Sequence, residues 1–221
     1  MSNNKNVDYN NYAKTFSNSR KNMKWEELDY FLDYISDIDN LKILDVWCWN
    51  WRLLKHLIDK NIKINKYLWV DLSEWLLSEA RKIHDSYDFL ELDMLKLDSI
   101  NEKFNIIFFV ASFHHLSCVE DRLLVLKEVY NLLEKWWLVL MTNWALNSSL
   151  NYNKYLKSII PESRNSFWSI DYNIKIWEYD RYYHCFDLTE LDFLVKNTWF
   201  KIIENKLFWN KKNLITILKK T

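Results

Sequence analysis

Residues 41–51 read LKILDVWCWNW, a mostly apolar run with one carboxylate, Asp45, followed by three tryptophans at alternate positions. The first six residues form a short apolar segment, as expected for a strand that is covered on both faces of a sheet. Residues 52–59 then have the spacing of a helix. A strand that turns directly into a helix is typical of a doubly wound α/β sheet, so this stretch predicts the class of the fold.

The alternation of helices and strands continues along the chain. Further strands are expected at 67–70, 88–92, 105–110, 138–142, 201–207 and 214–218, and helices at 26–36, 73–84, 119–134 and 188–197. A length of 221 residues favours one domain over two. We therefore expect a single α/β domain over residues 1–221, with a doubly wound, mostly parallel, Rossmann-like seven-stranded sheet and an antiparallel last strand. Residues 147–180 break the pattern, and we interpret them as an insertion.

The composition is abnormal in one respect. At an average usage of about 7%, a chain of this size would hold roughly 15 glycines, yet it holds 0 glycines and 13 tryptophans. The tryptophans cluster in turns that favour glycine, such as Trp136-Trp137 between helix and strand, and they lack the period of a buried face. We interpret most of them as glycine encoded by UGA and translated as tryptophan; Trp25 and Trp144 are expected to be genuine. The alternative is an aromatic-rich core.

Charge and cysteine content narrow the class of protein. Lysine plus arginine and aspartate plus glutamate both number 30, so no global basic field indicates nucleic acid. Cys48, Cys118 and Cys185 lie far apart, without zinc or redox spacing, and an odd number argues against a secreted disulfide framework. The start of the chain is polar, and no apolar run approaches the roughly 18 residues of a membrane span. These features predict a cytoplasmic protein without a membrane segment.

With glycine at Trp47, Trp49 and Trp51, residues 45–51 become a turn in which the backbone passes close to a nucleoside before entering a helix. Asp71 ends the next strand about 20 residues later, where a carboxylate can accept hydrogen bonds from two ribose hydroxyls. In this arrangement the chain resembles the class I S-adenosylmethionine-dependent methyltransferases. The resemblance implies S-adenosylmethionine as the cofactor, with Asp93-Met94 next to its adenine ring.

The residues that we expect to bind this cofactor are Arg20, Asp45, Trp47, Cys48, Trp49, Asp71, Leu72, Asp93, Met94 and Val110. Each has an ordinary alternative. Asp45 and Asp71 would then be caps at strand ends, Met94 would pack in the core, and Cys48 would be a small residue that fills a tight turn. The order and spacing of the whole set favour the cofactor site.

Three further segments narrow the resemblance to the tRNA wobble-uridine carboxymethyl methyltransferases. Residues 12–20, YAKTFSNSR, are similar to part of the N-terminal segment that covers the cofactor in that family. We expect this cofactor-covering segment to extend over residues 1–40 here. Residues 113–117, FHHLS, precede Arg122, and residues 181–186, RYYHCF, precede Glu190-Leu191. The resemblance implies tRNA as the substrate and a small activating protein subunit as a partner. The resemblance does not extend to the insertion at 147–180, which we expect on the substrate side. Two alternative functions therefore stay open: a methyltransferase of small molecules and a non-catalytic binding subunit with the same fold.

Candidate residues on the substrate side are His114, Arg181 and His184. An arginine offers a fork of donors to a phosphate or carboxylate, and aromatic rings stack on exposed bases. Lysines 206, 211, 212, 219 and 220 are candidate phosphate contacts. No metal is expected, because His114 and His115 are adjacent and no third ligand is suitably spaced. A carboxylate acceptor is already ionised at neutral pH and needs only positioning, whereas a hydroxyl or amine acceptor would make His114 the candidate base.

Overall fold

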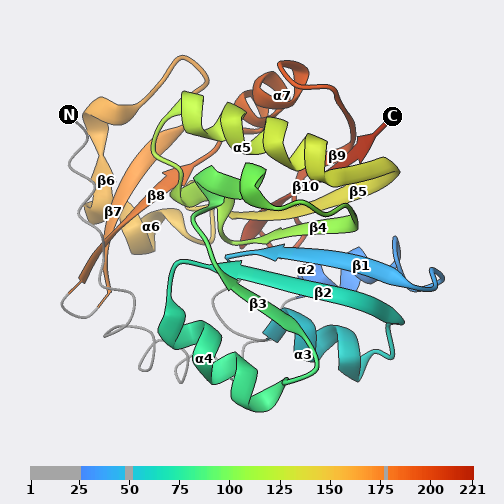
Figure 1. Ribbon diagram of the computed structural model, residues 1–221. Coiled ribbons are helices and arrows are strands. Elements are labelled where there is room, and N and C mark those ends of the chain that lie inside the picture. Colours follow the sequence, from blue (N-terminus) through green and yellow to red (C-terminus); the bar gives the residue numbers. More distant parts are fainter. Residues whose placement is uncertain (1–25, 48–51, 177–178) are drawn as a thin grey trace.

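The computed structural model describes residues 26–47, 52–176 and 179–221, and its centre is a seven-stranded sheet (Figure 1). In spatial order the strands are β3 (Asp88–Glu91), β2 (Ile64–Asp71), β1 (Leu41–Val46), β4 (Phe104–Val110), β5 (Leu133–Trp144), β10 (Asn213–Lys220) and β9 (Phe200–Leu207). All neighbours pair in parallel except β10, which is antiparallel to both β5 and β9. The doubly wound sheet with one antiparallel strand is confirmed.

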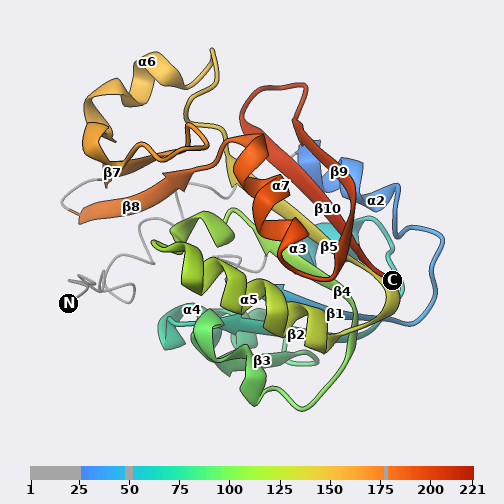
Figure 2. The same cartoon turned by 90° about the horizontal axis from the view of Figure 1, so that it is seen from above.

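Helices cover both faces of this sheet (Figure 2). One face packs against α2 (Glu26–Leu32), α3 (Arg52–Asp59) and α4 (Glu74–Ile83), and the other against η1 (Met94–Ser99), α5 (Val119–Leu132) and α7 (Leu188–Lys196). Side-chain caps start three of these helices: Ser73 Oγ accepts from the N–H of Leu76, Asp93 from that of Leu95, and Asp187 from that of Thr189. The order of the strands reverses at β1 and β4, and the carboxyl ends of strands on either side of such a reversal form a ligand-binding edge.

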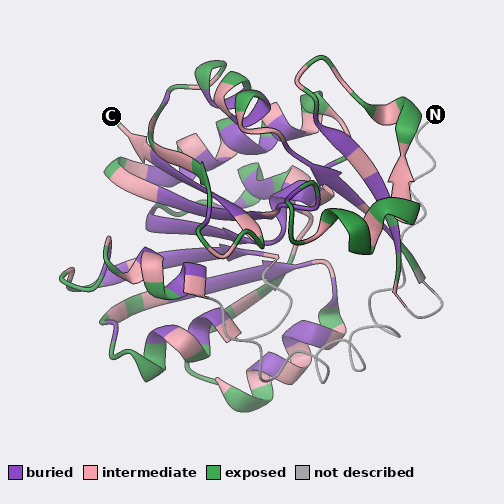
Figure 3. Cartoon of the chain, turned by 180° about the vertical axis from the view of Figure 1, so that it is seen from behind, coloured by how far each residue is buried: buried purple, intermediate pink, exposed green. Residues whose placement is uncertain are grey.

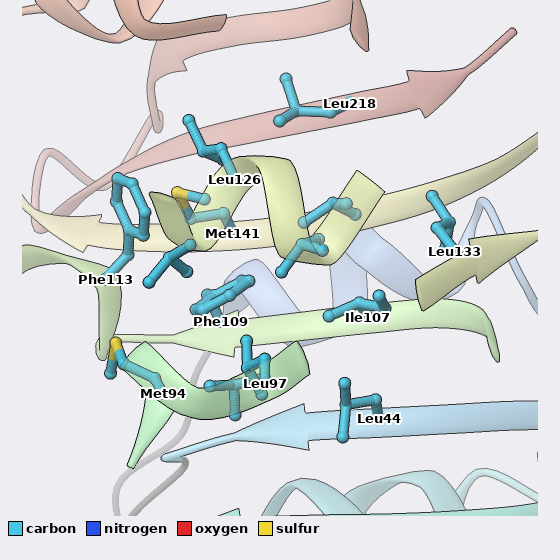
Figure 4. Packing of buried hydrophobic residues seen from close by; sticks show 14 of the residues in the cluster. Leu44, Met94, Leu97, Ile107, Phe109, Phe113, Leu126, Leu133, Met141 and Leu218 are labelled. Atoms are coloured by element: carbon cyan, nitrogen blue, oxygen red, sulfur yellow. The ribbon is translucent and has the colours of Figure 1, made fainter. Parts of the chain in front are cut away.

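The core lies on both sides of β4, which is buried along its whole length. Alternate residues of β4 enter opposite clusters: Ile107 and Phe109 lie with Leu44 and Met141, while Phe108 lies on the other face. Figure 4 shows the first cluster, with Leu97 and Leu126 closing it over the sheet. Burial of each large apolar side chain is worth about 1.5–3 kcal/mol, so this double-faced burial explains why the strand is apolar throughout.

A second, three-stranded sheet accounts for the segment that interrupts the sequence pattern. It consists of β6 (Ile159–Ile160), β7 (Ile170–Ile176) and β8 (Tyr179–Cys185), all antiparallel. The same region contains α6 (Tyr152–Tyr155), η3 (Leu156–Ser158) and η4 (Pro161–Ser163). In Figure 1 this small sheet lies beyond the carboxyl ends of the central parallel strands. Residues 181–185 of the RYYHCF motif therefore belong to β8, which lies beyond the ligand-binding edge.

Most element boundaries agree with the sequence prediction to within three residues, and two differ by more. The helix expected at 26–36 ends at Leu32, after which the chain turns. β5 begins at Leu133 instead of residue 138, and its pairing with β4 shifts register between Phe104 and Ile106, opposite the segment that contains Trp136. Figure 3 shows that exposure is concentrated on the helices and the turns. No helix in the described part of the chain is long and apolar enough to cross a membrane.

Candidate active site

The loop after β1 starts with a backbone conformation that is unfavourable for its side chain. Trp47 has a φ of 58°, and this left-handed region costs an L-residue other than glycine about 1–2 kcal/mol. Its N–H donates to the carbonyl of Val70 at 2.9 Å, and its indole Nε1 donates to the carbonyl of Leu92 at 3.2 Å. The indole therefore lies across the carboxyl ends of β2 and β3, where the adenosyl part of a cofactor is expected. Tryptophan at position 47 does not fit the cofactor, whereas glycine would.

Asp71 lies at the carboxyl end of β2 and is 7% exposed. Its Oδ1 accepts from the N–H of Ser73 at 2.9 Å. Burial raises the pKa of this carboxyl to about 7, although the N–H groups of Ser73 and Leu72 and the charge of Arg181 act in the opposite direction. Carboxyl groups with strongly shifted pKa values occur often at functional sites. The oxygens of Asp71 can accept hydrogen bonds from ribose hydroxyls. Asp71 therefore fits the expected cofactor, and it also serves as a local turn residue.

The other cofactor candidates are placed as follows. Asp93 is half-buried and caps η1 by accepting from the N–H of Leu95 at 3.0 Å, while Leu72 is half-buried beside Asp71. Val110 is fully buried at the end of β4. Met94 packs inside the core (Figure 4). Its surroundings agree with the alternative that Met94 is a core residue.

Asp45 points to the opposite face of the sheet from Val46 and accepts a hydrogen bond from Tyr67 Oη. Its contact is thus with a side chain of β2. Arg20, Cys48 and Trp49 lie outside the described residues, together with the rest of residues 1–25.

On the substrate side, the carboxyl end of β4 continues into η2 (Phe113–His115). His114 is 1% exposed, and its Nδ1 accepts from the backbone N–H of Trp144, at the end of β5, at 3.2 Å. Its Nε2 is buried without a hydrogen-bond partner among the described residues. Burial lowers the pKa of His114 well below its usual range, and the nearby charges of Arg181 and His184 lower it further. The ring is therefore neutral near neutral pH.

Arg181 projects from β8 toward this histidine pair. It is 2% exposed, and its Nη2 donates to Nε2 of His115 at 2.9 Å. Its guanidinium also lies 5.2 Å from the centre of the Tyr183 ring, which stacks on Trp144 at 4.9 Å. Burial lowers the pKa of His115 well below its usual range, and the charge of Arg181 adds to this effect. The structure thus brings His114 and Arg181 close together at the carboxyl edge of the central sheet.

His184 is placed differently from His114 and Arg181. Its Nδ1 lies 2.6 Å from Oδ1 of Asp171, and its Nε2 lies 2.9 Å from Oε2 of Glu190. Glu190 also accepts from Nη1 of Arg122 at 2.8 Å. Sequence reasoning identified Arg122 and Glu190 only as parts of similar motifs. Their contact with His184 links positions that are far apart along the chain, so no local pattern reveals it.

Comparisons with known proteins identify the type of domain. Residues 43–135 match the family described as "Methyltransferase domain". The tRNA (carboxymethyluridine(34)-5-O)-methyltransferase of Saccharomyces cerevisiae is 31% identical over 150 residues, which is 66% of this chain and 50% of that protein. The chain thus spans about half the length of that curated relative.

Solved structures show the fold. An S-adenosylmethionine-dependent methyltransferase from Clostridium acetobutylicum has a TM-score of 0.67 and 16% identity, with 96% of this chain and 98% of that chain covered. A chain of the complex between the Haloferax volcanii Trm112 methyltransferase activator and a methyltransferase has a TM-score of 0.70 and 10% identity, with 96% and 97% covered. The chain therefore carries a methyltransferase domain, built on the fold of the class I S-adenosylmethionine-dependent methyltransferases.

Proposed function

We propose that this protein transfers a methyl group from S-adenosylmethionine to the carboxylate of a carboxymethyl group on a tRNA wobble uridine. The observation that carries the choice of a carboxylate is the hydrogen bond that Nδ1 of His114 accepts from the backbone N–H of Trp144. S-adenosylmethionine, when bound, supplies a methyl group on a sulfonium, and the residues of the chain supply binding, orientation and exclusion of water.

The hydrogen bond to Trp144 assigns the tautomer of His114. In a neutral imidazole one nitrogen donates and the other accepts, and Nδ1 is the acceptor here. The proton is therefore on Nε2, which makes the free side of the ring a hydrogen-bond donor. A donor can orient a carboxylate but cannot take a proton from a hydroxyl or an amine. This geometry supports an acceptor that is already ionised.

Arg181 supports the same choice. Its charge is buried beside two histidines whose pKa values are lowered, so it supplies a cation close to His114. An arginine pairs with a carboxylate through two parallel hydrogen bonds, and such charge-assisted bonds are about twice as strong as neutral ones. We propose that Arg181 fixes the acceptor carboxylate and that His114 orients it.

The cofactor proposal requires a small residue at position 47, and the backbone supports glycine there. Positive φ values occur at Trp47, Trp136 and Trp168, at 58°, 75° and 67°. Bulky residues are outliers in this region, whereas glycine is not. Trp136, in the irregular first part of β5, and Trp168, before β7, are also 60% and 69% exposed, so neither indole is buried in the core. We call the chain with glycine at every tryptophan except Trp25 and Trp144 the glycine form, and we propose that it is the native protein.

A lysine-rich surface supports tRNA as the carrier of the acceptor. We call Lys154, Lys157, Lys211 and Lys212 the basic face. All four are exposed, and the stretches 147–158 and 205–213 that carry them contain no aspartate or glutamate. They adjoin each other, since Nζ of Lys211 lies 3.5 Å from Oγ of Ser149 and the carbonyl of Lys212 accepts from the N–H of Ala145 at 3.0 Å.

The basic face lies next to the acceptor side of the site. Nζ of Lys154 is 4.9 Å from the centre of the Tyr155 ring, and Tyr155 is 6.4 Å from Trp144, which lies 6.0 Å from His114. Of the other lysines considered from the sequence, Lys206 pairs with Glu204 and Lys220 donates to the carbonyls of Tyr130 and Leu133. The phosphates of tRNA would therefore be bound beside the insertion and not by Lys206 of β9 or Lys220 of β10.

An activating protein subunit is part of the proposal. One solved relative of similar fold is described in a complex with a methyltransferase activator. We propose that a small partner of this kind binds the chain in the cytoplasm, where tRNA is modified. Co-purification of the tagged glycine form from its own organism, followed by mass spectrometry, tests this part separately.

The decisive experiment is a methylation assay of the glycine form with S-adenosylmethionine, with and without such a partner. The substrates are tRNA from a strain that lacks the gene and, in parallel, a metabolite extract from that strain. Formation of the methyl ester of a carboxymethylated wobble uridine supports the proposal. Methylation in the metabolite extract alone would contradict tRNA as the substrate, and the absence of cofactor binding would contradict an enzyme.

A further inference from the structure

We infer that His184 is a positioning residue, whose ring bridges Asp171 and Glu190 and thereby holds the small sheet in place against the loop that carries His114. This inference rests on the proposed function for its effect on catalysis, but its structural content is independent of the acceptor. The residues involved come from four elements: Asp171 from β7, His184 from β8, Glu190 from α7 and Arg122 from α5.

The hydrogen bonds around His184 define its charge. Nδ1 lies 2.6 Å from the Asp171 carboxylate, and Nε2 lies 2.9 Å from the Glu190 carboxylate. Carboxylate oxygens accept and do not donate when ionised, so both ring nitrogens donate and the ring is an imidazolium. Asp171 also accepts from Tyr182 Oη at 2.8 Å, and Glu190 from Nδ2 of Asn165 at 3.0 Å.

Arg122 balances the network. Its Nη1 lies 2.8 Å from Oε1 of Glu190, and the side chains of Arg122, His184 and Glu190 are 4%, 4% and 3% exposed. Two cations and two carboxylates thus neutralise one another, with Asp171, whose side chain is 20% exposed, as the member nearest the surface. Buried charges are retained at an acceptable free energy only when they are paired in this way.

The network continues to the loop that carries His114. Nε and Nη2 of Arg122 donate to the carbonyl of Leu116 at 3.1 and 2.9 Å, directly after η2. Phe186 packs between these elements: its ring centre lies 4.5 Å from the His184 ring and 5.7 Å from Phe113. The loop that carries His114 is therefore fastened to the same ion network as the small sheet.

The small sheet carries the other acceptor-side residues. Nδ1 of His115 donates to the carbonyl of Tyr182 at 3.0 Å, and Arg181 contacts Nε2 of the same ring. A shift of β8 relative to η2 would change the distance between Arg181 and His114. Since both nitrogens of His184 are already engaged, this ring acts through its neighbours and does not exchange a proton with an acceptor.

The test compares His184→Gln, Asp171→Asn and the double variant in the glycine form, with His84→Gln as a matched control at the end of α4. We expect His184→Gln to lower kcat at least tenfold while the Kd for S-adenosylmethionine stays within twofold, because the cofactor side is separate. Asp171→Asn in the double variant removes the carboxylate left without its partner, so kcat should recover several-fold. An unchanged kcat in His184→Gln, or no recovery in the double variant, would overturn the inference.

A spectroscopic readout keeps the inference testable without turnover. At pH 7.5 the two ring nitrogens of His184 should both show the ¹⁵N shifts of protonated nitrogen, and Asp171→Asn should move the signals of His114 and His115. A single protonated nitrogen on His184, or unmoved signals on the loop, contradicts the bridge. These spectra also cover the case in which His184→Gln does not fold, and they test the bridge equally well if the wild-type chain methylates no tRNA.

Discussion

The backbone N–H of Trp144 and Nδ1 of His114 are 3.2 Å apart, so the end of β5 determines which nitrogen of a buried histidine carries the proton. Both groups lie at the carboxyl edge of the sheet, on neighbouring strands or the turn that follows them. A substitution of the Trp144 side chain leaves its backbone N–H in place. The backbone of β5 therefore keeps Nδ1 of His114 as an acceptor and Nε2 as a donor. The role of His114 follows from this contact.

We predict that His114→Gln keeps kcat within about tenfold of the wild type, since its side-chain amide can still donate. His114→Ala should lose on the order of 10²-fold or more, which is the usual size of a lost polar contact to the reacting group. Steady-state kinetics with the modified tRNA measure both. If Gln and Ala variants lose activity equally, His114 acts as a base and the carboxylate assignment is wrong.

A second prediction concerns position 47. The chain with tryptophan at all 13 positions should bind no S-adenosylmethionine in isothermal titration calorimetry, because the Trp47 indole lies over Leu92 at the place expected for the adenosyl group. The glycine form should bind it, and restoring tryptophan at position 47 alone should abolish binding again. Restoring Trp168, which is 69% exposed, is the matched control and should leave the Kd unchanged.

The central sheet could be predicted from sequence because its strands are buried on both faces. β4 reads as a continuous apolar run, and β1 ends at the turn that decides the fold. The small sheet was not predicted, although Ile170, Tyr172 and Ile174 alternate inward in β7. Its partner β8 buries Arg181 and His184 alongside Tyr183 and Cys185, so no apolar alternation marks it as a strand.

The site was predictable where it depends on position along the chain. Asp71 follows from its place at a strand end, and the glycine-like turn at Trp47 agrees with a φ of 58°. The ion network at His184 depends on contacts between residues 122, 171, 184 and 190, and the packing of α5, α7 and the small sheet creates them. Spacing in the sequence carries no information about such contacts.

The raised pKa of Asp71 predicts a pH dependence of cofactor binding. The pKa is about 7 in the folded chain and 3.8 in its ordinary state, so folding favours the protonated carboxyl. Its contribution to stability is thus fully present below pH 3.8 and is lost as the pH rises toward 7. Ribose hydroxyls favour the ionised form as an acceptor. The Kd for S-adenosylmethionine should therefore fall as the pH rises from about 5.5 to about 7.5, by up to roughly tenfold per pH unit below the pKa.

Calorimetric titrations at several pH values check this expectation. The side chain in Asp71→Asn cannot ionise. Its Kd for S-adenosylmethionine should therefore be higher than that of the glycine form and nearly independent of pH over the same range. Asp187→Asn is the matched control, because Asp187 also accepts from the backbone N–H two residues further on and is not among the expected cofactor residues. A pH dependence that survives in Asp71→Asn would assign the titration to another group.

The basic face predicts how tRNA binding responds to salt. Each phosphate neutralised by a lysine contributes roughly 0.7–0.9 to the slope of log K against log salt. Substituting Lys154, Lys157, Lys211 and Lys212 by glutamine should therefore lower the magnitude of that slope by about 3 and raise the KM for tRNA, with the Kd for S-adenosylmethionine unchanged. The control replaces Lys55, Lys60, Lys63 and Lys82, which are paired with carboxylates at 2.5–2.8 Å, and should leave the slope nearly as it was. If the two quadruple variants behave alike, the charge on this face does not recognise RNA, and the insertion then serves a smaller acceptor or a protein partner.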